Sequence, residues 1–282
     1  MPITLEEMWP LFETDKKIEN YSVNTLDGYK VQKNMLVRYF GNMDVNDINL
    51  LLLKKYLVDK GSHLKPSSLG MRIKFIRTYF RWMCDEGYCQ GNPTTKLKSP
   101  RLGKRIPKAF NEEEIEMLQE AGKHPIDFAL TSFLFSTGCR IGEVQKLNRS
   151  DINWENRSCI VLGKGNKQRE VYFGVKAKIR LKWYLESRND DCPALFISQR
   201  RPYRRLSISQ LRRITKRVAE KANISNTMYP HKWRHTFAMH MLNKGAPLEA
   251  VQDQLGHEDM KTTRIYCQLS GARRKSIHDF YF

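Results

Sequence analysis

The stretch 136–174, STGCRIGEVQKLNRSDINWENRSCIVLGKGNKQREVYFG, decides the fold because the spacing of apolar residues changes within it. Before it, apolar residues recur every three or four positions, which is typical of helices with one buried stripe. Within it the period becomes two, and SCIVLG (158–163) and REVYFG (169–174) form two strand patterns joined by the turn KGNK (164–167). Helical spacing then returns. The sequence therefore predicts a mainly α region with one small antiparallel sheet.

Residues 1–98 predict a separate all-helical bundle. Its apolar residues recur at helical spacing in several segments, one of which is DINLLLLKKYLVDKG (47–61). We expect Asp47 to open that segment and the serines of KPSSLG (65–70) to precede the next helix. Residues 99–109 are rich in Pro, Gly and basic residues, which indicates a linker. A second domain is predicted over 110–282, and its first helix is capped by Asn111.

The charge of the chain points to a polyanionic partner. Among 282 residues, 49 Lys and Arg against 30 Asp and Glu give a formal net charge of +19 and an isoelectric point near 9.7. Nucleic acid is the favoured partner, since the basic residues are spread along the chain and are not gathered on one amphipathic face, as membrane binding would favour. No apolar run is long enough to span a bilayer, and the acidic start MPITLEEMWP does not resemble a signal peptide. We expect a cytoplasmic protein that associates with the nucleoid through DNA.

The six cysteines form no CxxC pair and no zinc spacing. They are Cys84, Cys89, Cys139, Cys159, Cys192 and Cys267. In a cytoplasmic protein such residues are usually thiols that fill space in the core. We expect all six to be reduced.

Several residues in the second domain have the chemistry of a phosphate site, although each also has an ordinary explanation. Arg140 follows Gly138 at an expected helix start, where backbone N–H groups favour an anion. His231 and Arg234 are three residues apart and share a helix face. Tyr266, in KTTRIYCQLS (261–270), lies nine residues after His257. Singly, these are an exposed arginine, a histidine at the edge of the core and an aromatic residue at the surface.

Together, the ordered motifs resemble those of the tyrosine recombinase family, also called phage-type integrases. The motifs are TGCRIGEV (137–144), GKGNK (163–167), HKWRHTFA (231–238), LGH (255–257) and Tyr266. The resemblance covers about residues 110–268 at the level of motifs. The helical N-terminal part is similar in length and pattern to the family's core-binding domain, which implies a SAM-like bundle that binds DNA.

The resemblance implies a role for each matching residue. Arg140 and Arg234 would hold the scissile phosphate, and Lys164 would enter the minor groove from the hairpin turn. His231 and His257 match the two family histidines, and Tyr266 matches the nucleophile. Glu143 matches the family's acidic position and would orient its neighbours.

The chemistry of this set is consistent without reference to the family. Two arginines can hold both non-bridging oxygens of a phosphodiester, so neither a metal nor another cofactor is expected. Tyrosine is a weak nucleophile until a base such as His231 or His257 accepts its proton. Lys164 can protonate the departing 5′ oxygen. The expected enzyme cuts and rejoins DNA through a 3′-phosphotyrosyl ester, without ATP.

Three other interpretations remain. His231, His235 and His240 could suggest a zinc helix, but they lack the HExxH pattern and Arg234 would repel a cation; core or supporting positions suit the last two better. A type I topoisomerase uses similar tyrosyl chemistry without partner exchange, but the short GKGNK and LGH motifs favour a recombinase. A DNA-binding module without catalysis would not need Tyr266.

We expect a site-specific recombinase that acts on a double-stranded recombination site as a homo-tetramer or with a related recombinase. Arg212, Arg213, Lys216 and Arg217, in the densest basic cluster, are expected to contact DNA, unless they form a solvated basic face. The apolar end of GARRKSIHDFYF (271–282) is expected to dock on a neighbouring protomer as an assembly tail, or back on its own domain. The task is mobile-element integration, excision or resolution, or chromosome-dimer resolution.

Overall fold

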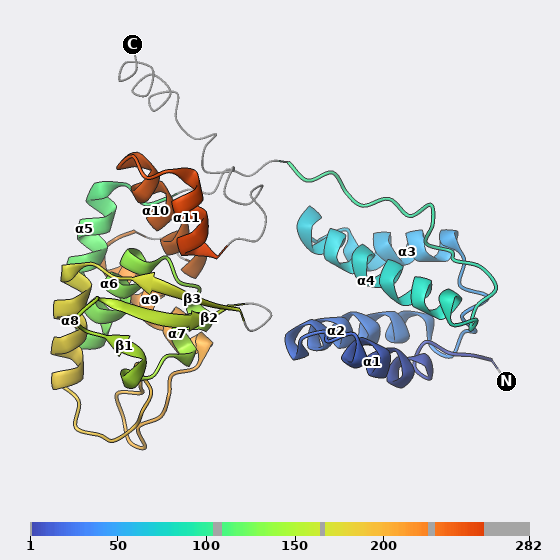
Figure 1. Cartoon of the computed structure of the whole chain (residues 1–282). Helices are drawn as coiled ribbons and strands as arrows, with labels where there is room; N and C mark the ends of the chain where they lie inside the picture. Colours follow the sequence, from blue (N-terminus) through green and yellow to red (C-terminus); the bar gives the residue numbers. More distant parts are fainter. Residues whose placement is uncertain (1, 104–108, 164–166, 225–228, 257–282) are drawn as a thin grey trace, which may run out of the picture. The chain divides into compact units, whose positions relative to one another are not determined.

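In a computed structural model of the chain, two compact units can be distinguished, Met1–Lys104 and Arg105–Phe282. Figure 1 shows their elements in sequence colours. The structure describes residues 2–103, 109–163, 167–224 and 229–256. Each unit has its own buried apolar cluster, so each is described by itself.

The first unit is an all-helical bundle, as its apolar spacing predicts. Its helices are α1 (Met8–Ile18), α2 (Val23–Phe40), α3 (Leu50–Gly61) and α4 (Pro66–Asp85). Aromatic rings fill its centre: the Phe12 ring lies 4.9 Å from that of Tyr79 and 5.3 Å from that of Trp82, both edge to face. Tyr79 also donates a hydrogen bond to the carbonyl of Leu5 at 2.6 Å. The amphipathic helices therefore close around an aromatic core.

The predicted starts of two of these helices are wrong by a few residues. Asn49, and not Asp47, caps α3, where its Oδ1 accepts from the backbone N–H of Leu52 at 3.1 Å. Asp47 lies two residues before this cap, too early to reach the free N–H groups of that helix. The serines of KPSSLG lie inside α4, which begins at Pro66, where the missing N–H of proline costs nothing.

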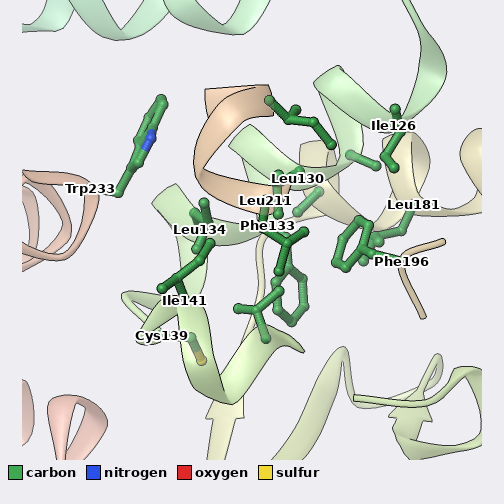
Figure 2. Close-up of a cluster of buried hydrophobic side chains, with 14 of the residues drawn as sticks. Ile126, Leu130, Phe133, Leu134, Cys139, Ile141, Leu181, Phe196, Leu211 and Trp233 are labelled. Atoms are coloured by element: carbon green, nitrogen blue, oxygen red, sulfur yellow. The ribbon is translucent and has the colours of Figure 1, made fainter. Parts of the chain in front are cut away.

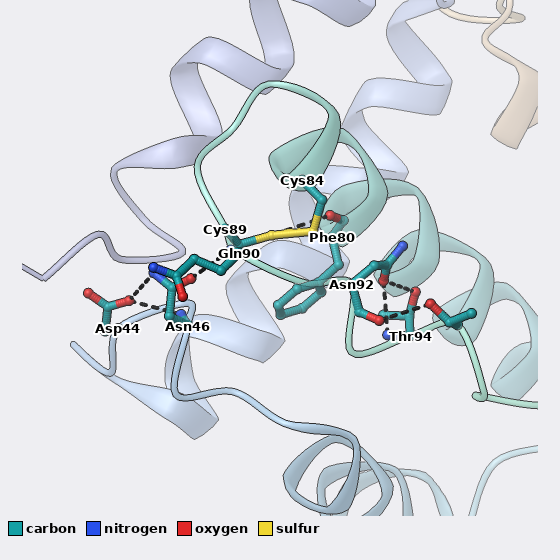
Figure 3. The surroundings of a disulfide bond; sticks show 9 residues. Asp44, Asn46, Phe80, Cys84, Cys89, Gln90, Asn92 and Thr94 are labelled. Carbon is teal, nitrogen blue, oxygen red and sulfur yellow. Dashed lines mark hydrogen bonds between the residues drawn. A yellow bond between two sulfur atoms is a disulfide. The ribbon is translucent and has the colours of Figure 1, made fainter.

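The prediction that all six cysteines are reduced is wrong for one pair. Cys84 and Cys89 form a disulfide, with 4.8 Å between their Cα atoms (Figure 3). Beyond the end of α4, Gly87 adopts a positive φ of 79°, and the chain reverses so that Cys89 returns to Cys84. This spacing matches none of the motifs sought in the sequence. Cys139, Cys159 and Cys192 are free thiols, and Cys267 lies outside the described residues.

The second unit combines helices with the predicted small sheet. Its helices are α5 (Glu112–Glu120), α6 (Pro125–Thr137), α7 (Ile141–Lys146), α8 (Val175–Glu186), α9 (Ile208–Lys221), α10 (Pro230–Asn243) and α11 (Leu248–Leu255). Asn111 caps α5 as predicted. The antiparallel sheet has the order β1 (Ile152–Asn153), β2 (Ser158–Leu162), β3 (Gln168–Tyr172). The two predicted strands are confirmed, whereas β1, two residues long, is too short to show a period in the sequence.

Helix α6 is the centre of the second unit. Leu130, Phe133 and Leu134 of this helix are fully buried. Figure 2 shows them among side chains of the surrounding helices, including Leu181 of α8 and Leu211 of α9. A helix that is apolar on most of its sides is stable when neighbouring elements cover those sides. The end of α6, where the candidate site begins, is therefore fixed by the core.

Helices α10 and α11 share a smaller apolar cluster of their own. Its buried members are Phe237, Ala238, Leu242, Val251 and Leu255. Trp233, earlier on α10, belongs instead to the main cluster around α6. Helix α10 therefore connects α11 to the main core of the unit.

We predict that Gly138→Ala destabilises the second unit. Gly138 ends α6 with a φ of +62°, and a Cβ there would lie 2.4 Å from Cδ1 of Phe237. The left-handed conformation alone costs a residue with a Cβ about 1–2 kcal/mol, and the clash adds to that. Urea unfolding followed by circular dichroism checks the loss. Gly142→Ala is the control, since a Cβ there would make an ordinary 3.7 Å contact with Ile208; equal stability of the two variants would contradict the prediction.

Candidate active site

The turn between α6 and α7 positions Arg140 as the motif predicts. Arg140 immediately precedes α7, and its backbone N–H donates to Oε2 of Glu143 at 2.7 Å. Its guanidinium donates to Oε1 of the same carboxylate at 2.9 Å. The Arg140 side chain is 35% exposed and that of Glu143 only 4%. A buried acid thus holds a cation that still reaches solvent.

Arg234 lies in the interior beside the same turn. It is 2% exposed, and its Nη1 donates to the carbonyl of Gly138 at 2.9 Å. Its Nη2 donates to the carbonyl of Leu255, the last residue of α11. Arg234 therefore joins α10 to the ends of α6 and α11, next to Arg140.

His231 lies one turn before Arg234, near the start of α10. Partial desolvation lowers the pKa of its imidazole, and the positive charges of Arg234, Arg140 and Arg212 lower that pKa further. The Glu143 carboxylate acts in the opposite direction. The imidazole is therefore held in its neutral form at neutral pH, in which one ring nitrogen can accept a proton. These charge effects also indicate that His231 shares one site with both predicted phosphate-binding arginines.

The other two histidines of α10, His235 and His240, are half-buried. Burial, with the nearby His231 and Arg234, lowers the pKa of His235 to about 4. The His240 ring stacks edge to face on Phe135 at 5.2 Å.

Sequence reasoning missed Arg169, the second main partner of Glu143. On β3, Arg169 donates from Nη1 to Oε1 of Glu143 at 2.9 Å and from Nη2 to Oε2 at 2.7 Å. Its Nε donates to the carbonyl of Gln254 at 3.0 Å. In the strand pattern, Arg169 is simply a polar position. No local signal identifies it, because the burial of Glu143, which makes a cationic partner necessary, is visible only in the fold.

Three predicted catalytic residues, Lys164, His257 and Tyr266, lie outside the described residues. Lys164 and His257 each directly follow a glycine that lies at the site. Gly163, before Lys164, is close enough to Glu143 that an added Cβ would lie 3.8 Å from Oε1. Gly256, before His257, packs on Arg169: a Cβ there would lie 2.9 Å from the Arg169 Cδ. The residues that precede Lys164 and His257 therefore both lie against the Glu143–Arg169 ion pair.

The basic cluster on α9 divides into two kinds of residue. Arg212 and Arg213 are exposed, and exposed Lys216 forms only a loose 3.5 Å ion pair with Glu220. Arg217 instead forms an ion pair with Asp127, a carboxylate that is 1% exposed. That makes Arg217 a structural partner on α9, whatever contact it makes with DNA.

Within the part of the chain that the structure describes, no group of three or more His, Cys, Asp or Glu is arranged to hold a metal ion. The same residues include no helix with the length and apolar character that crossing a bilayer requires.

We predict that Arg217→Ala destabilises the second unit, whereas Arg213→Ala does not. Removing Arg217 leaves Asp127 buried with only the backbone N–H groups of Lys123 and His124 as donors, at 3.0 and 3.2 Å. The expected loss is about 1–3 kcal/mol. The exposed Arg213 on the same helix should change stability by less than about 0.5 kcal/mol. Urea unfolding of both variants checks this, and equal effects would contradict it.

Known proteins with similar sequences and folds identify the family of the chain. Residues 108–273 match the sequence profile of the phage integrase family. The tyrosine recombinase XerC of Oceanobacillus iheyensis is 34% identical over 82% of this chain and 78% of its own. XerC of Haemophilus influenzae (strain PittEE) is 30% identical over 99% of this chain and 97% of its own. A crystal structure of the XerH site-specific recombinase bound to a palindromic difH substrate has a TM-score of 0.76 and 20% identity, and it covers 98% of this chain and 84% of that one. The chain therefore belongs to the phage integrase family and is a tyrosine-type site-specific recombinase.

Proposed function

We propose that this recombinase cuts and rejoins DNA through a 3′-phosphotyrosyl ester formed by Tyr266. The observation that carries the proposal is the convergence of Arg140, Glu143, His231 and Arg234 at the turn between α6 and α7. The described chain on either side also leads from this cluster into Lys164 and His257. A cluster of cations with a neutral base is what attack on a phosphodiester requires.

The arginines stabilise the negative charge that develops on the phosphate oxygens. Displacement at a phosphodiester adds negative charge to the non-bridging oxygens, and guanidinium N–H groups fixed in advance can bind them. Arg140 is fixed by Glu143 and yet partly exposed, so it can meet DNA from the solvent side. Arg234 lies at the same turn, and its planar guanidinium has the shape that binds phosphate oxygens.

The proton transfers follow from the ionisation states. Tyr266 loses its proton to His231 or His257 as its oxygen bonds to phosphorus; the low pKa of His231 keeps that imidazole ready to accept it. The bond from phosphorus to the 5′ oxygen breaks, and Lys164 supplies a proton to that oxygen. A 5′ hydroxyl of another strand then attacks the ester and releases Tyr266. Because the ester conserves the bond, rejoining needs no ATP.

DNA binding is shared between the two predicted domains. Residues 1–98 form the core-binding domain, 99–109 the linker, and 110–282 the catalytic domain, in which Arg212, Arg213, Lys216 and Arg217 contact the duplex. The XerH structure similar to this fold is bound to a recombination substrate, which supports a double-stranded DNA site as partner. The protein acts in the cytoplasm, at the nucleoid.

The active assembly is a tetramer of this chain, or of this chain with a related recombinase. Residues 271–282 serve as its assembly tail, docked on a neighbouring protomer. Its task is either the movement of a mobile element or the resolution of chromosome dimers. The genes that flank its own gene distinguish these, because a cluster of mobile-element genes favours the first.

We predict that Tyr266→Phe abolishes covalent adducts and preserves DNA binding. The substitution keeps the ring and removes the attacking oxygen. A nicked suicide substrate followed by denaturing electrophoresis measures the adduct, and gel shift measures binding. Tyr172→Phe is the control: Tyr172 lies half exposed on β3 and should still leave adducts. Adducts that persist in Tyr266→Phe would rule out this nucleophile.

We also predict that Arg140→Ala slows cleavage about a hundredfold or more at saturating DNA, by analogy with the loss of an oxyanion-hole donor. Single-turnover rates on the suicide substrate measure this. Excess EDTA should leave the wild-type rate unchanged, because arginines supply the positive charge. A rate that vanished with EDTA and returned with magnesium or zinc would point to a metal mechanism.

A further inference from the structure

We propose that Arg169 is a positioning residue for the strand-transfer reaction, which acts through Glu143 on Arg140 and through Gly256 on the chain entering His257. It connects three elements: β3, which carries it, α7, which carries Glu143, and the C-terminal end of α11. The proposal rests on the function proposed above.

The first observation is that one buried carboxylate serves two arginines. Each oxygen of Glu143 accepts one bond from Arg140 and one from Arg169, at distances between 2.7 and 2.9 Å. The Arg169 side chain is 13% exposed and Glu143 4%, so this pair is shielded from water. The bidentate geometry fixes the plane of the carboxylate. That plane in turn sets the direction in which Arg140 points.

Arg169 also helps to neutralise the Glu143 carboxylate, which Arg140 would otherwise have to neutralise alone. Burial alone would raise the pKa of Glu143, but the hydrogen bonds and charge of Arg169, with the hydrogen bonds from Arg140, hold that pKa below its ordinary value. With Arg169 absent, the negative carboxylate would compete with the DNA phosphate for Arg140. With Arg169 present, the three groups together keep one net positive charge for the phosphate.

The second observation is that two arginines donate hydrogen bonds to the C-terminal end of α11. Arg169 Nε binds the carbonyl of Gln254 at 3.0 Å, and Arg234 binds that of Leu255. These carbonyls form the negative end of the helix dipole, where cations are favoured. Gly256 then turns left-handed, with a φ of +61°, against the Arg169 side chain. His257 is the next residue, so Arg169 sets where the chain leaves the described part of the site.

The experiment compares three variants of the full-length protein on the suicide substrate. Arg169→Gln should lower the single-turnover rate at saturating DNA about 10- to 100-fold, the range expected for misplaced reacting groups, and change the Kd for DNA less than about threefold. Arg169→Lys keeps the charge without the fork and should recover part of the rate. Arg157→Gln, a loss of the same charge at an exposed position before β2, should match the wild type. Rates are measured at a temperature where circular dichroism finds every variant folded.

A double variant separates positioning from mere stability. Arg169→Gln alone leaves the Glu143 charge buried and half paired, and should lower the Tm. Glu143→Gln combined with Arg169→Gln removes that charge and should recover much of the Tm, while cleavage stays slow because Arg140 has lost its fixed partner. A rate that returned with the Tm, or an Arg169→Gln rate equal to the wild type, would overturn the proposal.

The pH profile is a readout that stability alone would not move. In Arg169→Gln the pKa of Glu143 rises, so the carboxylate becomes protonated at a higher pH. The fall of the cleavage rate on the acid side of the pH profile therefore moves to higher pH. Besides Arg169, the ionisable groups around Glu143 are Arg140 at the start of the same helix, the buried thiol of Cys139, and His231 on α10. An unshifted acid limb would contradict the positioning role. A wild type that formed no Tyr266 adduct would instead overturn the proposed function.

Discussion

Burying a full positive charge is the constraint on which the arrangement of α6, α10 and α11 depends. An unpaired charge in a protein interior costs several kcal/mol, so Arg234 must find acceptors. It finds them in the carbonyls of Gly138 and Leu255, each at the C-terminal end of a helix. Such ends carry partial negative charge. One guanidinium therefore aligns the ends of two helices against a third.

The same two helix ends explain where the candidate chemistry lies. Gly138 and Gly256 both leave their helices in the left-handed conformation, which a residue with a Cβ adopts only at a cost. Arg140 and His257 follow shortly after these glycines. Buried Glu143 and Arg169 occupy the space between the two turns. The proposed phosphate site therefore lies beside helix ends that the core already fixes.

The sequence predicted what periodicity and motif order encode, and missed what depends on distant contacts. The hairpin strands β2 and β3 were predictable because their apolar residues recur every two positions, whereas those of the flanking helices recur every three or four. Arg169 was not, because nothing local distinguishes a strand arginine in solvent from one bonded to a buried acid. The ion pair between Arg217 and Asp127 escaped for the same reason, since the two residues lie far apart in sequence. The disulfide escaped because the turn at Gly87, and no cysteine motif, brings its sulfurs together.

The two apolar clusters, one around Phe12 and Tyr79 and the other around α6, have no residue in common within the described chain. A substitution that repacks one cluster therefore has no shared side chain through which to strain the other. If residues 1–98 carry part of the DNA-recognition surface, target preference can diverge between lineages while the strand-transfer chemistry stays intact. Grafting the first unit of one recombinase onto the second unit of another is then a practical route to new target sites.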